Sequence, residues 1–252
     1  MAFLVYTDAK IYFSAYNISG YSNEIQLQQM VTLLPADTFD SSSTKKNVPG
    51  LKDFKGTAKG FMDYADIGAT AGVNLDSIFY GRIGGVGQAF SCAPVGNAEA
   101  DRAYFSQYVT GAFDPLSGKV GDLLPWSADF NAVGVPMIQG TVAAVGVKSS
   151  TGQTSATFNY PGGVLSNQRL YANLHVVSAS GTTPTLDVIV QSSVDNTFAS
   201  PTTRLTFTQA TSSVTSEHKS VAGAITDAYF RMKWTIGGTT PSYRIFGVIG
   251  IL

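Results

Sequence analysis

Apolar and polar residues alternate with a period of two along most of this chain. In the segment 24–28, Ile25 and Leu27 are the apolar positions, and in 230–236 the apolar positions include Phe230, Met232 and Trp234. A period of two places every second side chain on the same side of an extended strand. The alternation therefore predicts a protein made mainly of β-strands.

The predicted strands are separated by short turns rich in Gly, Pro, Ser and Thr, as in antiparallel sheets. One segment, 75–83, has helical spacing instead, with Asn74 as its N-cap, Asp76 in the first turn and Gly84 and Gly85 after its end. The fold class is therefore predicted to be all-β, mainly β with one short flanking helix. Strands are expected at 10–15, 24–28, 54–62, 103–113, 138–147, 170–177, 186–191, 204–208, 230–236 and 244–251.

A change in composition predicts a domain boundary. Residues 148–167 are rich in Ser, Thr and Gly and contain the turn sequence Tyr160-Pro161-Gly162-Gly163. We therefore expect a β domain at 1–147, a linker at 148–167 and a C-terminal β-sandwich, immunoglobulin-like or lectin-like, at 168–252. Residues 1–146 carry nine basic and thirteen acidic side chains, a net charge of −4, while 147–252 carry +3.

The composition excludes several classes of protein. Only 13% of the 252 residues are charged, the pI is near 6.1, and there are one cysteine and two histidines. These values argue against a basic nucleic-acid binder, a disulfide framework and a zinc site. The N-terminal residues lack a signal-peptide pattern and no apolar run reaches about 18 residues, so we expect synthesis in the cytoplasm and no membrane contact.

No catalytic constellation is visible in the sequence. His175 lies in a strand pattern, His218 in a polar stretch, and Cys92 has no basic neighbour in sequence. The carboxylate pair Glu99 and Asp101 matches no calcium loop. We expect no enzyme activity, no cofactor and no metal.

The many aromatic residues allow two interpretations. Exposed rings form platforms for sugars, whereas buried rings fill β-sandwich cores or line subunit interfaces. The residues considered as glycan-facing are Tyr171, Tyr229 and Tyr243.

The N-terminal half resembles the tail tube proteins of long-tailed, siphovirus-type bacteriophages. The segments that carry the resemblance are Asn17-Ile18-Ser19-Gly20, Ser22-Asn23-Glu24-Ile25, Leu34-Pro35-Ala36-Asp37-Thr38-Phe39-Asp40, Gly50-Leu51-Lys52, Gly60-Phe61-Met62-Asp63, Glu99-Ala100-Asp101-Arg102-Ala103-Tyr104-Phe105 and Gly118-Lys119-Val120-Gly121-Asp122-Leu123-Leu124-Pro125. They extend over most of residues 1–145. Their order and spacing carry the resemblance, because none of them is a catalytic signature.

The resemblance implies a structural virion protein. Members of this family form a small β-sandwich or barrel with a flanking helix, assemble as hexameric rings and stack into a tube through which double-stranded DNA leaves the virion. It implies self-association, contacts with other tail proteins, and a C-terminal domain that decorates the exterior. The segment from about 36 to 60 would be the long loop between rings, with the contact residues Asp37, Phe39, Asp40, Lys45, Lys46, Leu51, Lys52 and Phe54.

The sequence leaves two other functions open. One is a carbohydrate-binding or receptor-binding virion protein, and the other is a capsid decoration protein. The acidic excess in 1–146 is compatible with a tube, because a neutral or acidic lining lets DNA slide without sticking.

Overall fold

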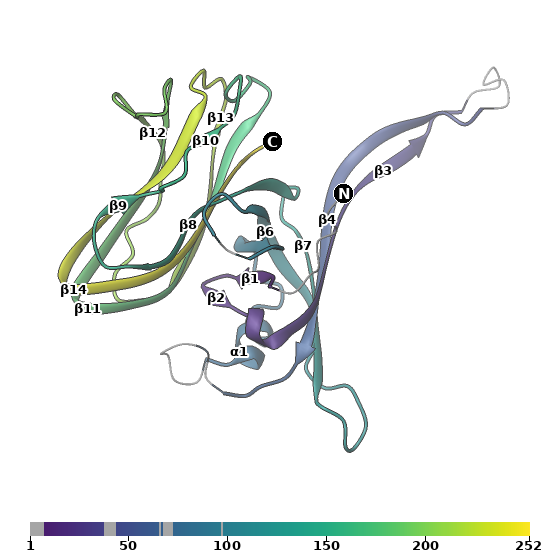
Figure 1. The fold of residues 1–252 in the computed structure, drawn as a ribbon. Helices are drawn as coiled ribbons and strands as arrows, with labels where there is room; N and C mark the ends of the chain where they lie inside the picture. Colours follow the sequence, from purple (N-terminus) through teal and green to yellow (C-terminus); the bar gives the residue numbers. More distant parts are fainter. Residues whose placement is uncertain (1–7, 38–43, 66, 68–72, 97) are drawn as a thin grey trace.

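The structure is a computed structural model that describes residues 8–37, 44–65, 67, 73–96 and 98–252. The described residues form antiparallel strand pairs with one short α-helix, which confirms the predicted all-β fold class. Figure 1 shows a sandwich on the left, a smaller curled sheet in the middle and a long β-hairpin that projects to the upper right.

The N-terminal half is a curled sheet with the strand order β3–β4–β7–β6–β5–β1. Phe13 on β1 packs edge-on against Phe130 on β7, with ring centroids 4.8 Å apart, although these strands are not neighbours in the sheet. The sheet must therefore curl round an aromatic core. The strands are β1 (Lys10–Phe13), β2 (Tyr16–Asn17), β3 (Ser22–Pro35), β4 (Asn47–Phe61), β5 (Gln88–Ala93), β6 (Arg102–Asp114), β7 (Pro125–Ala132) and β8 (Ile138–Lys148).

Helix α1 (Leu75–Tyr80) covers one opening of this core. The Asn74 side chain accepts a hydrogen bond from the Ser77 amide, and the Ser77 hydroxyl accepts one from the Asn74 amide, which confirms the predicted N-cap. The predicted end at residue 83 is wrong. The helix stops at Tyr80, because the Gly84 amide beyond it bonds to the carbonyl of Thr110 on β6 and draws the chain onto the sheet.

Residues 148–167 are not a free linker in the structure. Strands β9 (Gly152–Gln153) and β10 (Phe158–Asn159) both pair with β14 (Tyr229–Ile251). Glu99 accepts hydrogen bonds from the amide and hydroxyl of Ser155, which ties this segment to the N-terminal half. Since β14 also pairs with β8, one sheet continues across the expected boundary. Independent folding of the two halves stays a prediction.

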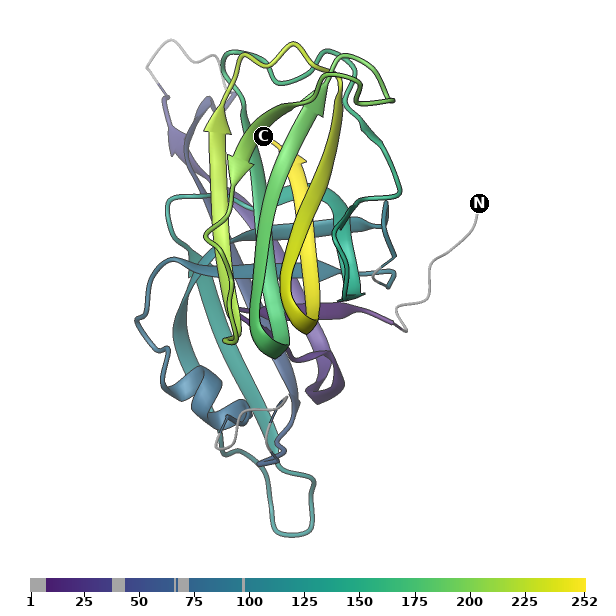
Figure 2. The ribbon, with the colours of Figure 1, turned by 90° about the vertical axis from the view of Figure 1, so that its left-hand side faces the viewer.

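The C-terminal half is a long two-stranded ribbon folded back on itself. β11 (Arg169–Ser193) pairs with β14 along almost its whole length. The expected strands 170–177 and 186–191 are both part of β11, and the expected strands 230–236 and 244–251 are both part of β14. Figure 2 shows these two long strands in green and yellow. β13 (Thr215–Ala222) flanks the first part of β11, and β12 (Thr202–Thr206) flanks the second part. Apolar residues from both parts share one core, which makes the half a two-layered sandwich.

Each long strand turns at the same tetrapeptide, Gly-Thr-Thr-Pro, which occurs at 181–184 and again at 238–241. Gly181 and Gly238 have φ of 121° and 106°, and Thr183 and Thr240 have φ of 47° and 49°. The two corners lie against each other, because a Cβ on Gly181 would be 2.9 Å from the carbonyl oxygen of Thr240. A side chain does not fit at either glycine, so the repeated motif sets the fold of the ribbon.

Candidate assembly surface

The outer part of the β3–β4 hairpin is exposed. β3 has 14 residues and pairs only with β4 among the described strands, so its outer edge carries unpaired amide and carbonyl groups. Single charges, lysines and prolines usually protect such an edge from other strands. Between Ser22 and Leu34 the only charged residue is Glu24, which leaves this edge unprotected.

Most of the expected inter-ring contact residues lie at the outer part of this hairpin. Asp37, Lys45, Lys46, Leu51 and Lys52 are exposed there, and the Asp37 carboxylate accepts a hydrogen bond from the Lys46 amide. The segment 47–60 is strand β4 and not loop, because it pairs with β3 along its length.

Three of the expected contact residues are not found on the exposed part of the hairpin. Phe39 and Asp40 lie outside the described residues. Phe54 is fully buried in the aromatic core, where its ring lies 5.9 Å from that of Phe130, so its assignment to a surface contact is wrong. Side chains alternate between the two faces of β4, and Phe54 shares the core-facing side with Gly56 and Ala58.

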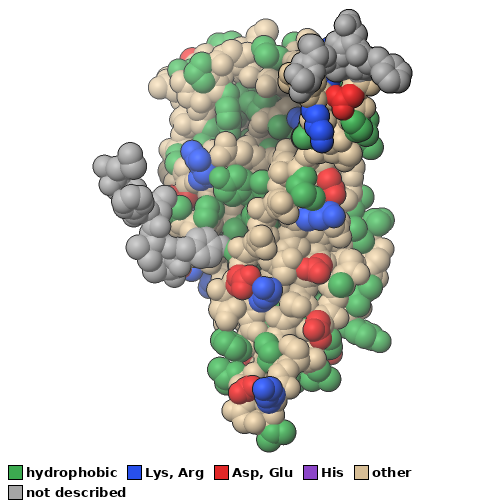
Figure 3. Space-filling model, turned by 90° about the vertical axis from the view of Figure 1, so that its right-hand side faces the viewer, with side chains coloured by type: hydrophobic (Ala, Val, Ile, Leu, Met, Phe, Trp, Pro, Cys, Tyr) green, Lys and Arg blue, Asp and Glu red, His purple; other side chains and the backbone are tan. Residues whose placement is uncertain are grey.

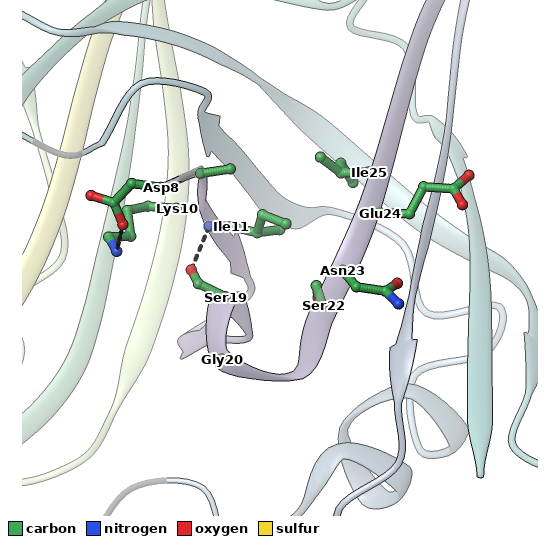
Figure 4. Close-up of a pocket in the computed structure, with 10 residues that line it drawn as sticks. Asp8, Lys10, Ile11, Ser19, Gly20, Ser22, Asn23, Glu24 and Ile25 are labelled. Atoms are coloured by element: carbon green, nitrogen blue, oxygen red, sulfur yellow. Dashed lines mark hydrogen bonds and ion pairs between the residues drawn. The ribbon is translucent and has the colours of Figure 1, made fainter. Parts of the chain in front are cut away.

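A slot separates the two ends of the curled sheet. β1 and the start of β3 face each other without pairing, and the hollow between them has a volume of about 340 Å³ (Figure 4). The Ser19 hydroxyl accepts a hydrogen bond from the Ile11 amide at 2.8 Å and closes the base of the slot. Lys10 is ion-paired with Asp8 on the β1 wall. The curled sheet is therefore open on one side, where the free edge of β3 begins.

The opposite edge of the sheet is also open. β6 pairs with β7 as far as Asp114, but its pairing with β5 ends at Tyr108. An isolated bridge from Ile83 reaches Thr110, and no described strand covers residues 111–114 beyond it. The sheet β3–β4–β7–β6 therefore has an unpaired edge on each side.

The solvent face of that sheet is polar and close to charge balance. Residues directly opposite one another share a face, and Glu24 on β3 lies opposite Lys59 on β4. The Lys59 ammonium lies 2.9 Å from the Glu24 carboxylate, and Lys55 lies 4.0 Å from Asp53. Figure 3 shows a face of the molecule on which red and blue side chains lie close together on a largely uncharged surface. The charged residues of this face are Glu24, Asp53, Asp114, Asp129, Lys55 and Lys59, a net charge of −2.

The two halves meet at a buried polar cluster that the sequence did not reveal. His175 Nδ1 donates to the carbonyl of Ser14, and its Nε2 accepts from the Ser91 hydroxyl at 2.8 Å. The Asn173 amide donates to the carbonyl of Phe90 at 2.8 Å, and its oxygen accepts from His218 Nδ1 at 2.6 Å. Burial lowers the pKa of both histidines to about 4, so both are neutral at pH 7.

The hydrogen-bond partners in this cluster are those of a structural contact and not those of a catalytic site. Ser91 and His175 form a serine–histidine pair, but both are fully buried, and the second ring nitrogen of His175 meets a backbone carbonyl instead of a carboxylate. A nucleophile must reach its substrate, and this hydroxyl does not. Within the described residues no group of three or more His, Cys, Asp or Glu side chains could hold a metal ion.

The chain is similar in fold to several proteins of known structure. A chain in the virion of a native gene transfer agent is 11% identical with a TM-score of 0.39, covering 51% of this chain and 93% of that chain. A chain of the sheath–tube complex of an extracellular contractile injection system, PVC, is 11% identical with a TM-score of 0.38, covering 54% of this chain and 90% of that one. The SPP1 Dit protein, described as a paradigm of the hub adsorption apparatus in phages infecting Gram-positive bacteria, is 7% identical with a TM-score of 0.38. The match covers 98% of this chain and 100% of that chain.

Scores below 0.5 do not by themselves assign this chain a role. No family model matches the chain, and no curated protein matches its sequence.

The tyrosines considered for sugar binding do not form a platform. Tyr243 is fully buried and Tyr171 is 8% exposed, so the prediction that they face a glycan is wrong. Both rings fill the interior instead, Tyr171 beside the ring of His218 and Tyr243 with its hydroxyl directed at the carbonyl of Ala210. Tyr229 is partly exposed at the start of β14. No helix among the described residues is long and apolar enough to cross a membrane.

Proposed function

We propose that this chain is a structural subunit of a bacteriophage tail. Six copies close into a ring by pairing the outer edge of β3 with the open edge of β6 in the next copy. The rings stack into a tube that conducts double-stranded DNA during ejection. The protein contacts other tail proteins and is located in the virion tail.

The observation that carries this proposal is the unpaired edge of β3. Along the fourteen residues of β3, the backbone groups directed away from β4 are unpaired, and the outer part of the strand from Met30 to Leu34 carries no charge. A monomer with such an edge would aggregate, whereas a ring in which each edge meets the next copy pairs the outward groups of the part of β3 that lies against β6. The second open edge, at residues 111–114 of β6, supplies the complementary partner in that ring.

The polar face of the sheet supports the role of a DNA conduit. If the sheet closes with its aromatic core outward, this face lines the channel. Both of its lysines have a carboxylate within 4.0 Å, so neither is left free to hold phosphate groups. A lining with a net charge of −2 for each copy repels DNA weakly and releases it readily.

The C-terminal sandwich is then displayed outside the tube. In Figure 1 it lies on the side of the curled sheet away from the β3–β4 hairpin. The buried cluster around His175 and Asn173 holds it there.

Electron microscopy of the purified full-length chain tests the proposal. We expect sixfold rings or rods, and a chain that remains monomeric at high concentration would contradict it. Two neighbouring substitutions, Gln26→Pro and Leu27→Pro, give a matched pair. Successive amides of β3 point in opposite directions, so one proline breaks the hairpin while the other removes only an outward donor. The proline that leaves thermal unfolding unchanged should still prevent ring formation.

A further inference from the structure

Besides the slot, a hollow lies where the two halves of the chain meet. Its volume is about 390 Å³, which is in the range of small-molecule sites, and such sites occur preferentially where two packed units meet. Strands β1 and β2 and the turn after β2 form one wall, and the β11–β14 ribbon forms the other. The side chains that line it include Lys10, Tyr16, Asn17, Tyr21, Val177 and Arg244.

Alternation along two strands places a cation on each wall. The Tyr12 ring on β1 stacks on the Phe246 ring on β14, with centroids 4.1 Å apart. Lys10 and Arg244 each precede one of these rings by two residues, so each lies on the same face of its strand as that ring. Figure 4 shows the Lys10 side chain on the side of β1 away from Ile25. Both cations therefore border the junction just beyond its buried aromatic contact.

A β-bulge interrupts the ribbon at this point. Ser178 lies opposite Arg244, and Val176 lies opposite the next residue of β14. Val177 is therefore an extra residue on β11 with no partner of its own on β14. Bulges redirect side chains and are over-represented next to active sites. This bulge brings an apolar side chain and a cation to the same hollow.

Arg244 is the cation of the hollow that has no counter-ion among the described residues. Its side chain is exposed, and it takes part in none of the ion pairs of the part of the chain that the structure describes. Lys10, in contrast, is paired with Asp8. An unpaired guanidinium in a hollow is suited to an anionic group of a ligand, because it forms two parallel hydrogen bonds to a carboxylate or a phosphate.

The charges around the hollow also favour an anion. Arg82 is next to it, because its guanidinium lies 5.2 Å from the centroid of the Tyr16 ring. Asp66 precedes Ile67 of the hollow in the sequence and lies outside the described residues, and it is counted here by sequence alone. The charged residues in or next to the hollow carry a net charge of +1: Lys10, Arg82, Arg244, Asp8 and Asp66.

The neutral groups of the hollow suit a sugar ring. Tyr16 and Tyr21 are partly exposed there, and aromatic rings combine an apolar surface with a polar hydroxyl group. The Asn17 side-chain oxygen accepts hydrogen bonds from the amide of Ser19 at 3.0 Å and from its hydroxyl at 2.6 Å. These bonds leave the NH₂ group of Asn17 as a donor for a ligand hydroxyl.

We propose that this hollow binds an acidic saccharide, which is a sugar ring that carries a carboxylate or a phosphate. The acid group pairs with Arg244, whose planar guanidinium matches either anion. The sugar ring packs against the two tyrosines and Val177, and Asn17 donates to one of its hydroxyl groups. This inference goes beyond the proposed function and does not depend on assembly.

Isothermal titration calorimetry of the dispersed full-length chain tests the proposal. The probes are glucuronic acid, glucose 6-phosphate and uncharged glucose. At least one acidic sugar should bind about tenfold more tightly than glucose, which corresponds to one charge-assisted contact. Binding of both acidic sugars, or of one alone, supports the site and identifies the acid group that it accepts. Equal affinities for all three sugars, or no binding of either acidic sugar, would overturn the proposal.

Arg244→Gln and Arg102→Gln give a matched pair, because both arginines are exposed and only Arg244 lines the hollow. Arg244→Gln should weaken binding of the acidic sugar about tenfold, whereas Arg102→Gln should leave it unchanged. Val177→Trp should fill the hollow and abolish binding with every charge kept, and thermal unfolding shows that each variant is folded. Equal losses in the two arginine variants, or undiminished binding in Arg244→Gln, would overturn the proposal.

Discussion

His175 on β11 accepts a hydrogen bond from Ser91 on β5 at 2.8 Å, and this contact joins the two halves of the chain where both residues are fully buried. The neutral imidazole has a defined tautomer, because its Nδ1 donates to the carbonyl of Ser14. The attachment of the sandwich to the curled sheet therefore depends on an uncharged histidine.

Acidification should weaken this attachment. Burial lowers the pKa of His175 from 6.5 to about 4 in the folded chain. Between these values the unfolded chain binds a proton that the folded chain does not, so the free energy of unfolding falls as the pH falls from about 6.5 to 4. The loss for His175 is roughly 3 kcal/mol at 1.36 kcal/mol for each pKa unit. Denaturant unfolding at a series of pH values measures it.

The variant His175→Gln provides the control for that measurement. It should be less stable at pH 7 and show a shallower dependence on pH in the same window. An unchanged slope would show that His175 does not titrate as the structure requires. His218, whose pKa burial also lowers to about 4, adds a loss of the same sign and remains in the variant.

Removing the carboxylates of the polar face should make it bind DNA. In the triple variant Glu24→Gln, Asp53→Asn, Asp129→Asn, Lys55 and Lys59 lose their acidic neighbours. Affinity for a short duplex should rise several-fold at low salt. The slope of log K, where K is the association constant for DNA, against the logarithm of the salt concentration should become steeper. The change should be the one expected for about two additional phosphate contacts. Fluorescence anisotropy across a salt series measures both quantities.

A matched variant separates location from net charge in this experiment. Asp187→Asn, Asp195→Asn, Glu217→Gln changes the charge of the sandwich by the same amount. It should leave DNA binding at the level of the wild type. Equal gains in the two triple variants would show that the polar face has no special role.

The corners of the ribbon should not tolerate side chains. Gly181→Ala and Gly238→Ala each place a Cβ within 2.9 Å of backbone atoms of the other corner, at φ above 100°. Each should lower the free energy of unfolding by about 1–3 kcal/mol. Gly20→Ala, where a Cβ meets nothing within 4 Å, should be close to neutral. Thermal unfolding compares the three, and equal effects would contradict the close approach of the corners.

The fold class could be predicted from alternation, but the path of the long strands could not. Periodicity identified 170–177 and 186–191 as strands, and the Gly-Thr-Thr-Pro between them read as an ordinary turn. In the structure it bends one continuous strand, because a second copy of the motif at 238–241 faces it. The repeat itself was the available signal, since two identical tetrapeptides in a two-stranded ribbon indicate matched corners.

The position of the candidate surface was predictable in part. The resemblance placed a projecting segment near 36–60, and its exposed residues Lys46 and Leu51 lie on the hairpin. Phe54 was assigned to the surface although its alternation with Gly56 and Ala58 places it in the core. The cluster of Asn173, His175 and Ser91 could not be predicted, because more than 80 residues separate partners whose contact depends on tertiary packing.

Hydrogen exchange along β3 tests the central claim most directly. The amides of residues 22–35 should be compared in dispersed chains and in assembled particles. The account predicts that a run of the outward amides of β3, those directed away from β4, becomes protected only on assembly. Assembled particles in which the outward amides of β3 still exchange as fast as in the dispersed chain would contradict it.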